Sequence, residues 1–392
     1  MANATANTDA TQAHILRLPP ELMENVAAHV PVEGLAGTQI DVQRHQQQDF
    51  YVSLPAFTDK TFLLAYPKSM QALVDISQHT VFGKCLKRVR LLTLEIITAR
   101  EDEHTRGPSA VRKSRDDRRR HRETRQIHYG LSEEQRSYMQ SSKWRHLLWH
   151  ALTNYKANNP DTGICLEIDA IQNIGAPSPT GEKNLERKLG YQGCLAISSY
   201  PGPNLETTLW KVLLDAYCPV LELTMNASNI DVPLDFFNTN IPHNQGFAAA
   251  FDRMRKLDTS VHTPYNRGAT LQDARQASMQ AFADLLSKLS HLEVVVLTNR
   301  AYDWDEGNKL MKIISSYAYM PALQSLELHG SYTGVCDLVS FVSRHKHTLR
   351  ALEASINPTD GRSMSLMDAE ERIKRAAGDK PFELVRHWPQ QW

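Results

Sequence analysis

Three segments in the last third of the chain repeat the same arrangement of apolar residues, with apolar side chains at the first, fourth and sixth positions. The segments begin at Leu292, Leu323 and Leu349. Alternating apolar residues predict short half-buried strands, and the stretches between them have apolar residues three or four apart, which predicts helices. This part of the chain is therefore restricted to folds in which strands and helices alternate.

The same periodicities extend back to Trp144. The predicted helices are Trp144–Tyr155, Leu205–Tyr217, Leu271–Leu289, Lys309–Tyr319 and Cys336–His345. The predicted strands are Ile164–Ile168, Leu221–Met225, Leu257–Val261, Leu292–Leu297, Leu323–Leu328 and Leu349–Glu353. One such strand–helix unit cannot bury its own apolar face, so neighbouring units have to stack side by side.

Strand–helix units repeating at about 20–30 residues are typical of leucine-rich repeats. We therefore predict an α/β fold in which residues 144–358 form a leucine-rich-repeat-like solenoid of irregular strand–helix units, followed by a separate C-terminal segment, 359–392. A doubly wound α/β domain produces the same alternation and is the alternative fold.

The composition excludes several functional classes. Lys and Arg number 44 and so do Asp and Glu, so no net charge attracts the chain to nucleic acid or membranes. The five cysteines are far apart and include no CxxC pair, which predicts reduced core thiols. Residues 1–13 are polar and lack the apolar core of a secretory signal, and no apolar run is long enough to span a bilayer. We expect a cytoplasmic or nuclear protein.

A short helix bounded by prolines is predicted near the start of the chain. Pro20 suits a first helical position, and Leu22, Val26 and Val30 then recur four residues apart, giving one apolar face. A second short helix, Ser69–His79, is followed by Val81-Phe82-Gly83 and by a predicted strand, Val89–Ile96.

These two segments, at this distance, resemble the F-box and the segment after it in fungal F-box proteins. Beyond Leu35, where the F-box helices should continue, the sequence departs from that pattern into a glutamine-rich stretch. The resemblance divides the N-terminal half into a polar tail (1–13), a small helical F-box-like module (14–60), and a connecting helix and first strand (61–100).

The resemblance implies a non-enzymatic substrate receptor of a Skp–cullin–F-box ubiquitin ligase. Its partners would be a Skp-family adaptor, a cullin and a protein target on the solenoid. The residues expected at the adaptor are Leu18, Pro19, Pro20, Leu22, Val26 and Val30. The alternative is a protein-interaction scaffold without a link to a ligase, whose N-terminal helix caps the solenoid.

A charged insertion, 101–143, separates the two halves. Glu101–His128 has almost no apolar residues, so we predict a solvated loop or fraying helix. Its arginine-rich run, 112–122, is compatible with a nuclear-localisation or nucleic-acid-binding arm. Acidic residues dilute that run and no aromatic residue lies within it for base stacking, so nucleic acid is an unlikely partner.

The predicted strands place one residue each on the face opposite the helices. In the register of the repeat, these residues are Glu95, Glu167, Glu222, Asp258, Val296, Glu327 and Glu353. A nearly continuous acidic column predicts binding of a basic segment of the target, with Glu222, Asp258, Glu327 and Glu353 as the contacts. The alternative is that the column reflects only the polar outward positions of any strand.

No motif for catalysis or for a cofactor is present, since HExxH, GxSxG and a GxGxxG after a strand are all missing. We therefore expect no enzymatic activity, no cofactor and no metal site. His345 and His347 flank Lys346 near a predicted helix end, where solvated cationic side chains are expected.

Overall fold

The computed structural model describes residues 57–96, 115–169, 179–180, 182, 185, 195–197, 205–225, 231–240, 246–262, 270–299, 304–357 and 364–386. These residues form two compact units, each with its own internal contacts. The first unit contains β1–β3, β5 and the helices α4, α5, α7 and α8, and the second contains β4 and the elements from α10 onward.

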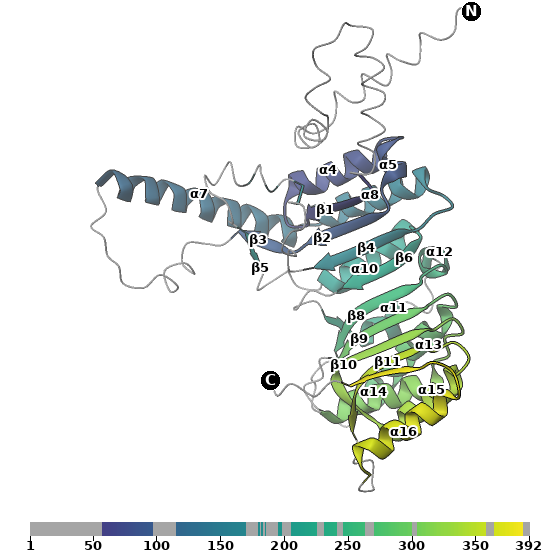
Figure 1. The fold of residues 1–392 in the computed structure, drawn as a ribbon. Helices are drawn as coiled ribbons and strands as arrows, with labels where there is room; N and C mark the ends of the chain where they lie inside the picture. Colours follow the sequence, from purple (N-terminus) through teal and green to yellow (C-terminus); the bar gives the residue numbers. More distant parts are fainter. Residues whose placement is uncertain are drawn as a thin grey trace, which may run out of the picture. The chain divides into compact units, whose positions relative to one another are not determined.

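The described residues of the first unit form four helices and two small groups of strands (Figure 1). Strands β1 (Asp59–Leu63) and β2 (Arg88–Leu92) pair in parallel, and β3 (Leu94–Ile96) pairs with β5 (Leu195–Ile197) in antiparallel fashion. The helices are α4 (Pro67–Gln78), α5 (Phe82–Cys85), α7 (Arg115–Gln140) and α8 (Lys143–Asn158). The helix–turn–strand order predicted for residues 69–96 is confirmed, with the strand divided into β2 and β3.

Helices α4 and α8 pack against each other and are held together at one end by side-chain amides. Pro67 occupies the first turn of α4, where its missing N–H removes no hydrogen bond. The Asn158 amide of α8 donates to the carbonyl oxygen of Ser77 at 2.7 Å, and Asn159 donates to that of Gly83 at 2.8 Å. These bonds satisfy carbonyl groups where α4 ends and α5 follows.

Helix α7 decides between the two alternatives, a solvated loop or a fraying helix, that the sequence left open for the charged insertion. Residues 115–140 are helical, because Arg, Glu and Gln are good helix formers even without an apolar face. The last turns of α7 also pack: Leu131 lies against the core of Leu63, Tyr66 and Leu92, and the Gln135 amide donates to the Leu94 carbonyl oxygen at 3.2 Å. Residues 101–114 lie outside the described part of the chain.

The second unit is built on a parallel sheet in which the strands follow chain order, β4-β6-β8-β9-β10-β11-β12. The strands are β4 (Ile164–Asp169), β6 (Val220–Met225), β8 (Lys256–His262), β9 (Val294–Asn299), β10 (Ser325–Gly334), β11 (Ala351–Asn357) and β12 (Glu383–Arg386). A short strand, β7 (Asp231–Pro233), also pairs with β8. This order has no reversal of direction along the sheet, whereas a doubly wound sheet has one.

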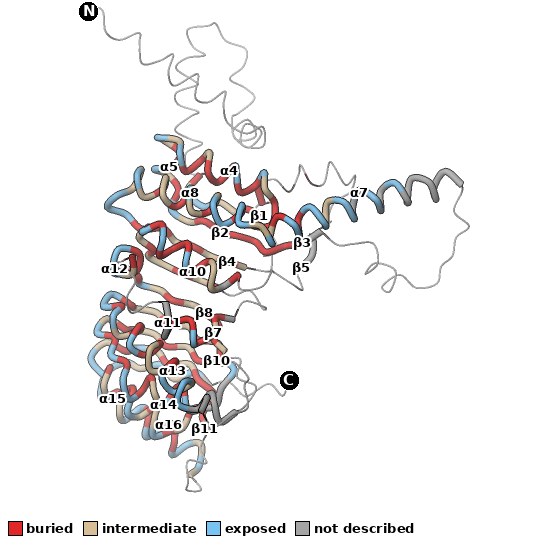
Figure 2. Tube along the Cα trace, turned by 180° about the vertical axis from the view of Figure 1, so that it is seen from behind, coloured by how far each residue is buried: buried red, intermediate tan, exposed pale blue. Residues whose placement is uncertain are grey.

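The helices of this unit cover one face of the sheet. They are α10 (Leu205–Ala216), α11 (Asp235–Asn240), α12 (Gly246–Phe251), α13 (Thr270–Lys288), α14 (Trp304–Tyr317), α15 (Val335–His345) and α16 (Leu366–Ala377). The strands lie in front of these helices in Figure 1 and behind them in Figure 2, which is turned by 180°. Within the strands, buried residues alternate with half-buried ones, as in β4 and β9. The buried residues face the helices and the half-buried ones form an open face.

The sheet continues beyond residue 358, where the sequence indicated that the repeats end. Helix α16 begins with Ser365, whose hydroxyl accepts a hydrogen bond from the Asp368 N–H at 3.1 Å, and it ends before Gly378. Strand β12 then pairs with β11 in parallel. The segment 359–392 therefore contributes one more helix and one more strand to the unit.

His345 was expected to be a solvated cation, and this expectation is wrong. The side chain is buried at 2% exposure, and its ring stacks on Phe341. Its Nε2 accepts the backbone N–H of Met320 at 3.1 Å, so the proton of the neutral ring is on Nδ1, 2.9 Å from the Phe341 carbonyl oxygen. Burial lowers the pKa of His345, which is consistent with this neutral, structural role.

The cysteines match their expected core positions only in part. Cys218 is buried, Cys85 and Cys165 are half-buried, and Cys336 is exposed at the start of α15; none of these four is in a disulfide. Cys194 lies outside the described residues.

Gly330 occupies an irregular point of β10, where the pairing with β11 shifts between Leu328 and Tyr332. Its φ of 76° is a conformation that L residues rarely adopt, and an added Cβ would overlap the backbone oxygen of Asn299. We expect Gly330→Ala to lower the free energy of unfolding by about 2 kcal/mol or more, measured by chemical denaturation of the full chain.

Gly130→Ala is the matched control for this substitution. Gly130 lies in α7 and a Cβ there meets no atom within 4 Å, so alanine should leave stability unchanged or raise it slightly. Equal stability of the Gly330→Ala variant and the wild type would contradict the strain assigned to Gly330.

Candidate functional site

The open face of the second unit carries a row of acidic side chains that crosses the sheet. The pairing register aligns one residue from each strand, from β4 to β12. In order, the row is Glu167, Thr224, Asp258, Val296, Glu327, Glu353 and Val385. Adjacent strands lie about 4.8 Å apart, so the six strands from Glu167 to Glu353 span about 24 Å. We call these seven residues the acidic row.

The register agrees with the sequence prediction for most of this row. Glu167, Asp258, Val296, Glu327 and Glu353 are aligned as expected. Their part in binding a target stays a prediction.

Two predicted members of the column are corrected. Glu222 pairs with Cys165 and Lys256, two residues before the row on the same open face. Thr224 is the residue of β6 that lies in the row. Glu95 lies in β3, which pairs with β5 in the first unit and takes no part in the row.

The predicted adaptor contacts Leu18, Pro19, Pro20, Leu22, Val26 and Val30 lie outside the described residues.

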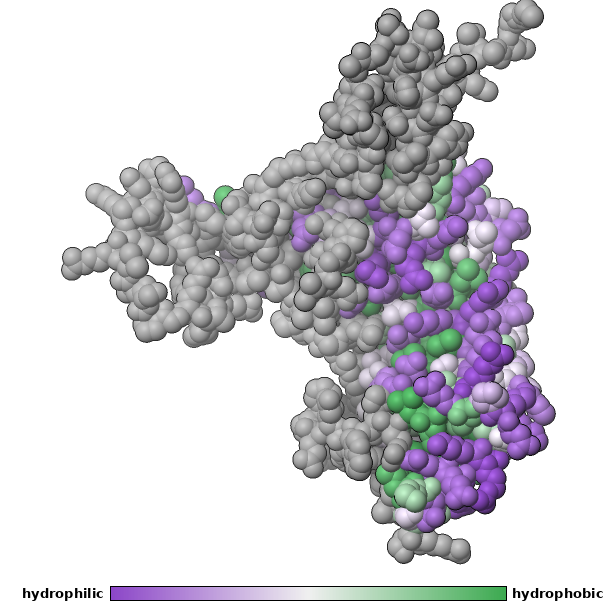
Figure 3. All heavy atoms as spheres, in the orientation of Figure 1, coloured by the Kyte–Doolittle hydropathy of each residue, from purple (hydrophilic) through white to green (hydrophobic). Residues whose placement is uncertain are grey.

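The row is charged but not uniformly so. Figure 3, which shows this face in the orientation of Figure 1, has hydrophilic and hydrophobic residues interspersed. Val296 separates Asp258 from Glu327, and Lys256 lies beside Glu222 in the neighbouring row. The acidic row itself contains four carboxylates and no basic residue.

The pKa of Asp258 is altered by its burial and by the other charged side chains of this face. Its pKa is raised, first because burial removes water from the carboxylate, and further because Glu327 and Glu167 repel its negative charge. Lys256 and His329 act in the opposite direction. The carboxylates of β4, β8 and β10 therefore interact electrostatically, although their strands are not all adjacent.

His329 adds an imidazole beside Glu327 and Glu353 of the row. It lies two residues after Glu327 on the same face of β10, and its Nε2 is 3.8 Å from a carboxylate oxygen of Glu327. Ligand atoms of Glu327, His329 and Glu353 all lie within 4.8 Å of one another. Two carboxylates and an imidazole are a donor set that Zn²⁺ accepts in proteins. The expectation that the chain holds no metal stays a prediction. The sequence analysis followed one residue per strand and so did not single out His329.

No model of a known protein family matches the chain, and a search of curated proteins found no match. Among the described residues, no helix combines the length and the apolar character that are needed to cross a membrane.

The raised pKa of Asp258 predicts how stability depends on pH. A carboxyl group whose pKa is higher in the folded state binds its proton more tightly there, so stability decreases as pH rises from about 4 through the raised pKa. We expect Asp258→Asn to unfold at a higher denaturant concentration than the wild type at pH 7, with the difference disappearing towards pH 4.

Asp284→Asn is the control, since Asp284 is exposed on α13. The same gain of stability in both variants at pH 7 would contradict a destabilising effect of burial and neighbouring acids that is specific to Asp258.

Proposed function

We propose that the chain is a non-enzymatic protein-binding protein, and that it acts as a substrate receptor of a Skp–cullin–F-box ubiquitin ligase. In this proposal the second unit is a leucine-rich-repeat-like solenoid, and a basic segment of the target lies on its open face. The observation that carries the proposal is the acidic row on the face that helices leave open.

The topology of the second unit supports the solenoid. Each strand pairs with the strands before and after it in the chain, and most steps from one strand to the next include a helix on the same face. Stacked units of this kind expose one broad sheet face, which repeat proteins use as a binding surface.

The charge and dimensions of the row support a basic partner. Glu327 and Glu353 lie opposite each other on adjacent strands, where two like charges repel. A cationic partner removes that repulsion. A span of about 24 Å corresponds to roughly seven or eight residues of extended chain. The partner is therefore a short basic segment rather than a single side chain.

The link to the ligase depends on the N-terminal residues, which lie outside the described part of the chain. Burying three aliphatic side chains such as Leu22, Val26 and Val30 contributes several kcal/mol at most, so other residues of the module must add to the adaptor contact. If that helix instead packs on the solenoid, the chain is a scaffold that binds targets without an adaptor.

The basic-segment proposal is tested with an eight-residue arginine peptide and a glutamate peptide of the same length, by fluorescence anisotropy at low salt. We expect only the arginine peptide to bind. The double variant Glu327→Lys/Glu353→Lys should weaken binding at least tenfold, because two attractive charges become repulsive. Including EDTA prevents a cation at Glu327, His329 and Glu353 from competing.

Asp284→Lys/Glu371→Lys is the matched control. It makes the same change of charge at two exposed residues of α13 and α16, on the side of the sheet that the helices cover. Equal weakening in the two double variants would assign the binding to net charge and refute a role for the open face.

The ligase link is tested by co-purification of the adaptor and the cullin with the full chain. We expect Leu22→Asp to abolish co-purification, because a carboxylate would replace an apolar contact. Asn25→Asp is the control, since it adds the same charge away from the Leu22–Val26–Val30 face. Retention of the adaptor by Leu22→Asp would refute the assignment, and absence of the adaptor from the wild type would favour the scaffold.

A further inference from the structure

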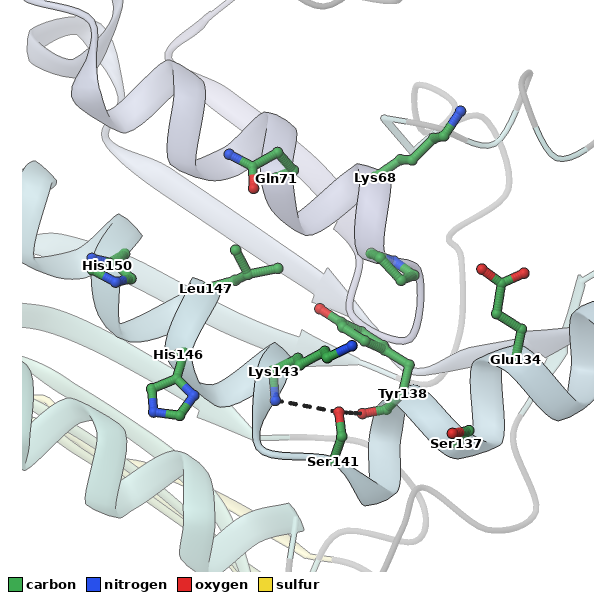
Figure 4. Close-up of a pocket in the computed structure, with 11 residues that line it drawn as sticks. Lys68, Gln71, Glu134, Ser137, Tyr138, Ser141, Lys143, His146, Leu147 and His150 are labelled. Atoms are coloured by element: carbon green, nitrogen blue, oxygen red, sulfur yellow. Dashed lines mark hydrogen bonds between the residues drawn. The ribbon is translucent and has the colours of Figure 1, made fainter.

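A groove of about 780 Å³ lies in the first unit, between α4, the last turns of α7 and the first half of α8 (Figure 4). This volume is in the range of small-molecule binding sites. The groove takes no part in the proposed function, which uses the second unit and the N-terminal residues.

Two helix N-termini meet this groove, and neither has the side chains that usually accompany one. The N-terminus of a helix carries unpaired N–H groups and a positive partial charge, which acidic or capping side chains normally offset. Neither α4 nor α8 has a side-chain cap from its N-cap residue or an acidic residue in its first turn, and at α8 only the Ser141 hydroxyl accepts an N–H, that of Lys143 at 3.3 Å. Instead, Lys68 is the second residue of α4 and Lys143 the first of α8, and both line the groove.

This arrangement concentrates positive charge. A lysine at a helix N-terminus is unfavourable, and here two such ends lie beside one groove. Glu134 supplies one carboxylate among the lining residues, against the two lysine ammonium groups. An anion bound at the two helix ends would offset both the partial charges and the lysines.

Tyr138 provides the second, independent observation. Its side chain is only 6% exposed, and its hydroxyl has no hydrogen-bond partner among the described residues. Burial raises the pKa of this hydroxyl, which therefore stays protonated and able to donate. Figure 4 shows the hydroxyl pointing into the space between α4 and α8, near the side chain of Lys143, while the exposed Lys68 side chain points from the first turn of α4 away from Tyr138.

An unpaired buried hydroxyl costs free energy that a ligand oxygen could recover. The other hydroxyl nearby is already engaged, because the Ser141 hydroxyl donates to the Tyr138 carbonyl oxygen at 2.6 Å. Farther along α8, the groove is lined by His146, Leu147 and His150, which offer a partly apolar wall.

We propose that this groove binds a small organic phosphate. The phosphate lies at the N-terminal ends of α4 and α8, held by Lys143 and by a hydrogen bond from Tyr138, and the flexible Lys68 side chain turns toward it from the first turn of α4. The organic part of the molecule lies along α8, against Leu147 and the two histidines. Phosphate suits the site because it is a dianion with several acceptor oxygens, and helix N-termini bind it readily.

The test uses phenyl phosphate, inorganic phosphate and phenol as probes, with the full chain in isothermal titration calorimetry. We expect phenyl phosphate to bind with one site per chain, inorganic phosphate to bind more weakly at the same site, and phenol not to bind. Saturation by neither phosphate probe up to millimolar concentration would overturn the proposal.

Three variants locate the site. Lys68→Glu/Lys143→Glu should weaken phenyl phosphate at least tenfold while raising the thermal stability of the free protein, because acidic residues favour helix N-termini. Lys84→Glu/Lys87→Glu is the matched control at two exposed lysines of the same unit, outside the groove. Tyr138→Phe should weaken binding about threefold to tenfold and leave the free protein at least as stable as the wild type, because the buried hydroxyl that it removes is unpaired there.

Equal affinity in the two double-lysine variants would overturn the proposal, and so would full affinity in Tyr138→Phe. Failure of the arginine peptide to bind the second unit would leave these outcomes unchanged, since the two sites share no residues.

Discussion

The second unit depends on one constraint: the strands from β4 to β11 bury side chains against helices that lie on one face of the sheet. Residues such as Leu166, Leu257, Val295 and Leu326 face those helices and are almost completely buried. Burying a side chain of this size contributes about 1.5–3 kcal/mol relative to leaving it exposed. A slip of one residue in any strand would move its buried set into water, so the register is strongly determined.

That register in turn places the acidic row. Because the apolar positions are committed to the helices, the positions between them must face the open side, whatever their charge. At Asp258, Glu327 and Glu353 the chain carries carboxylates there, and at Asp258 the cost is visible in a pKa raised by burial and by neighbouring acids. Natural proteins tolerate such local costs where a binding surface requires them. The interruption by Val296 and the proximity of Lys256 limit the total repulsion.

The strands β2, β4, β6 and β8–β11 and most of the longer helices could be predicted because their apolar periodicity is the same property that buries them, whereas β1, β5, β7 and β12 were not predicted. The pattern failed where it was ambiguous. Strand β6 has apolar residues at 221, 223 and 225, so both Glu222 and Thr224 lie between apolar positions, and only the pairing with β4 shows that Thr224 is the residue opposite Glu167. His345 follows Phe341 by four residues and Leu338 by seven, so its place on the buried stripe of α15 was available in the sequence.

Other features depend on contacts that no local pattern reveals. Helix α7 has few apolar residues in its first half, and only its last turns meet the core of the first unit. The groove beside Tyr138 needs three helices to meet, and the sequence predicted no helix over the turns of α7 that line it. His329 became part of the candidate site only once the pairing of β10 with β11 aligned Glu327 with Glu353.

The sequential order of the strands also affects how such a protein can evolve by gaining or losing strand–helix units. Each described strand from β8 to β11 is hydrogen-bonded to the strand before it and to the strand after it in the chain. A whole strand and its following helix can therefore be duplicated or deleted, and the remaining strands keep their pairings and their buried faces. Lengthening by such steps would extend the exposed surface by about 4.8 Å at a time, so the reach of the surface is adjustable without redesigning its core.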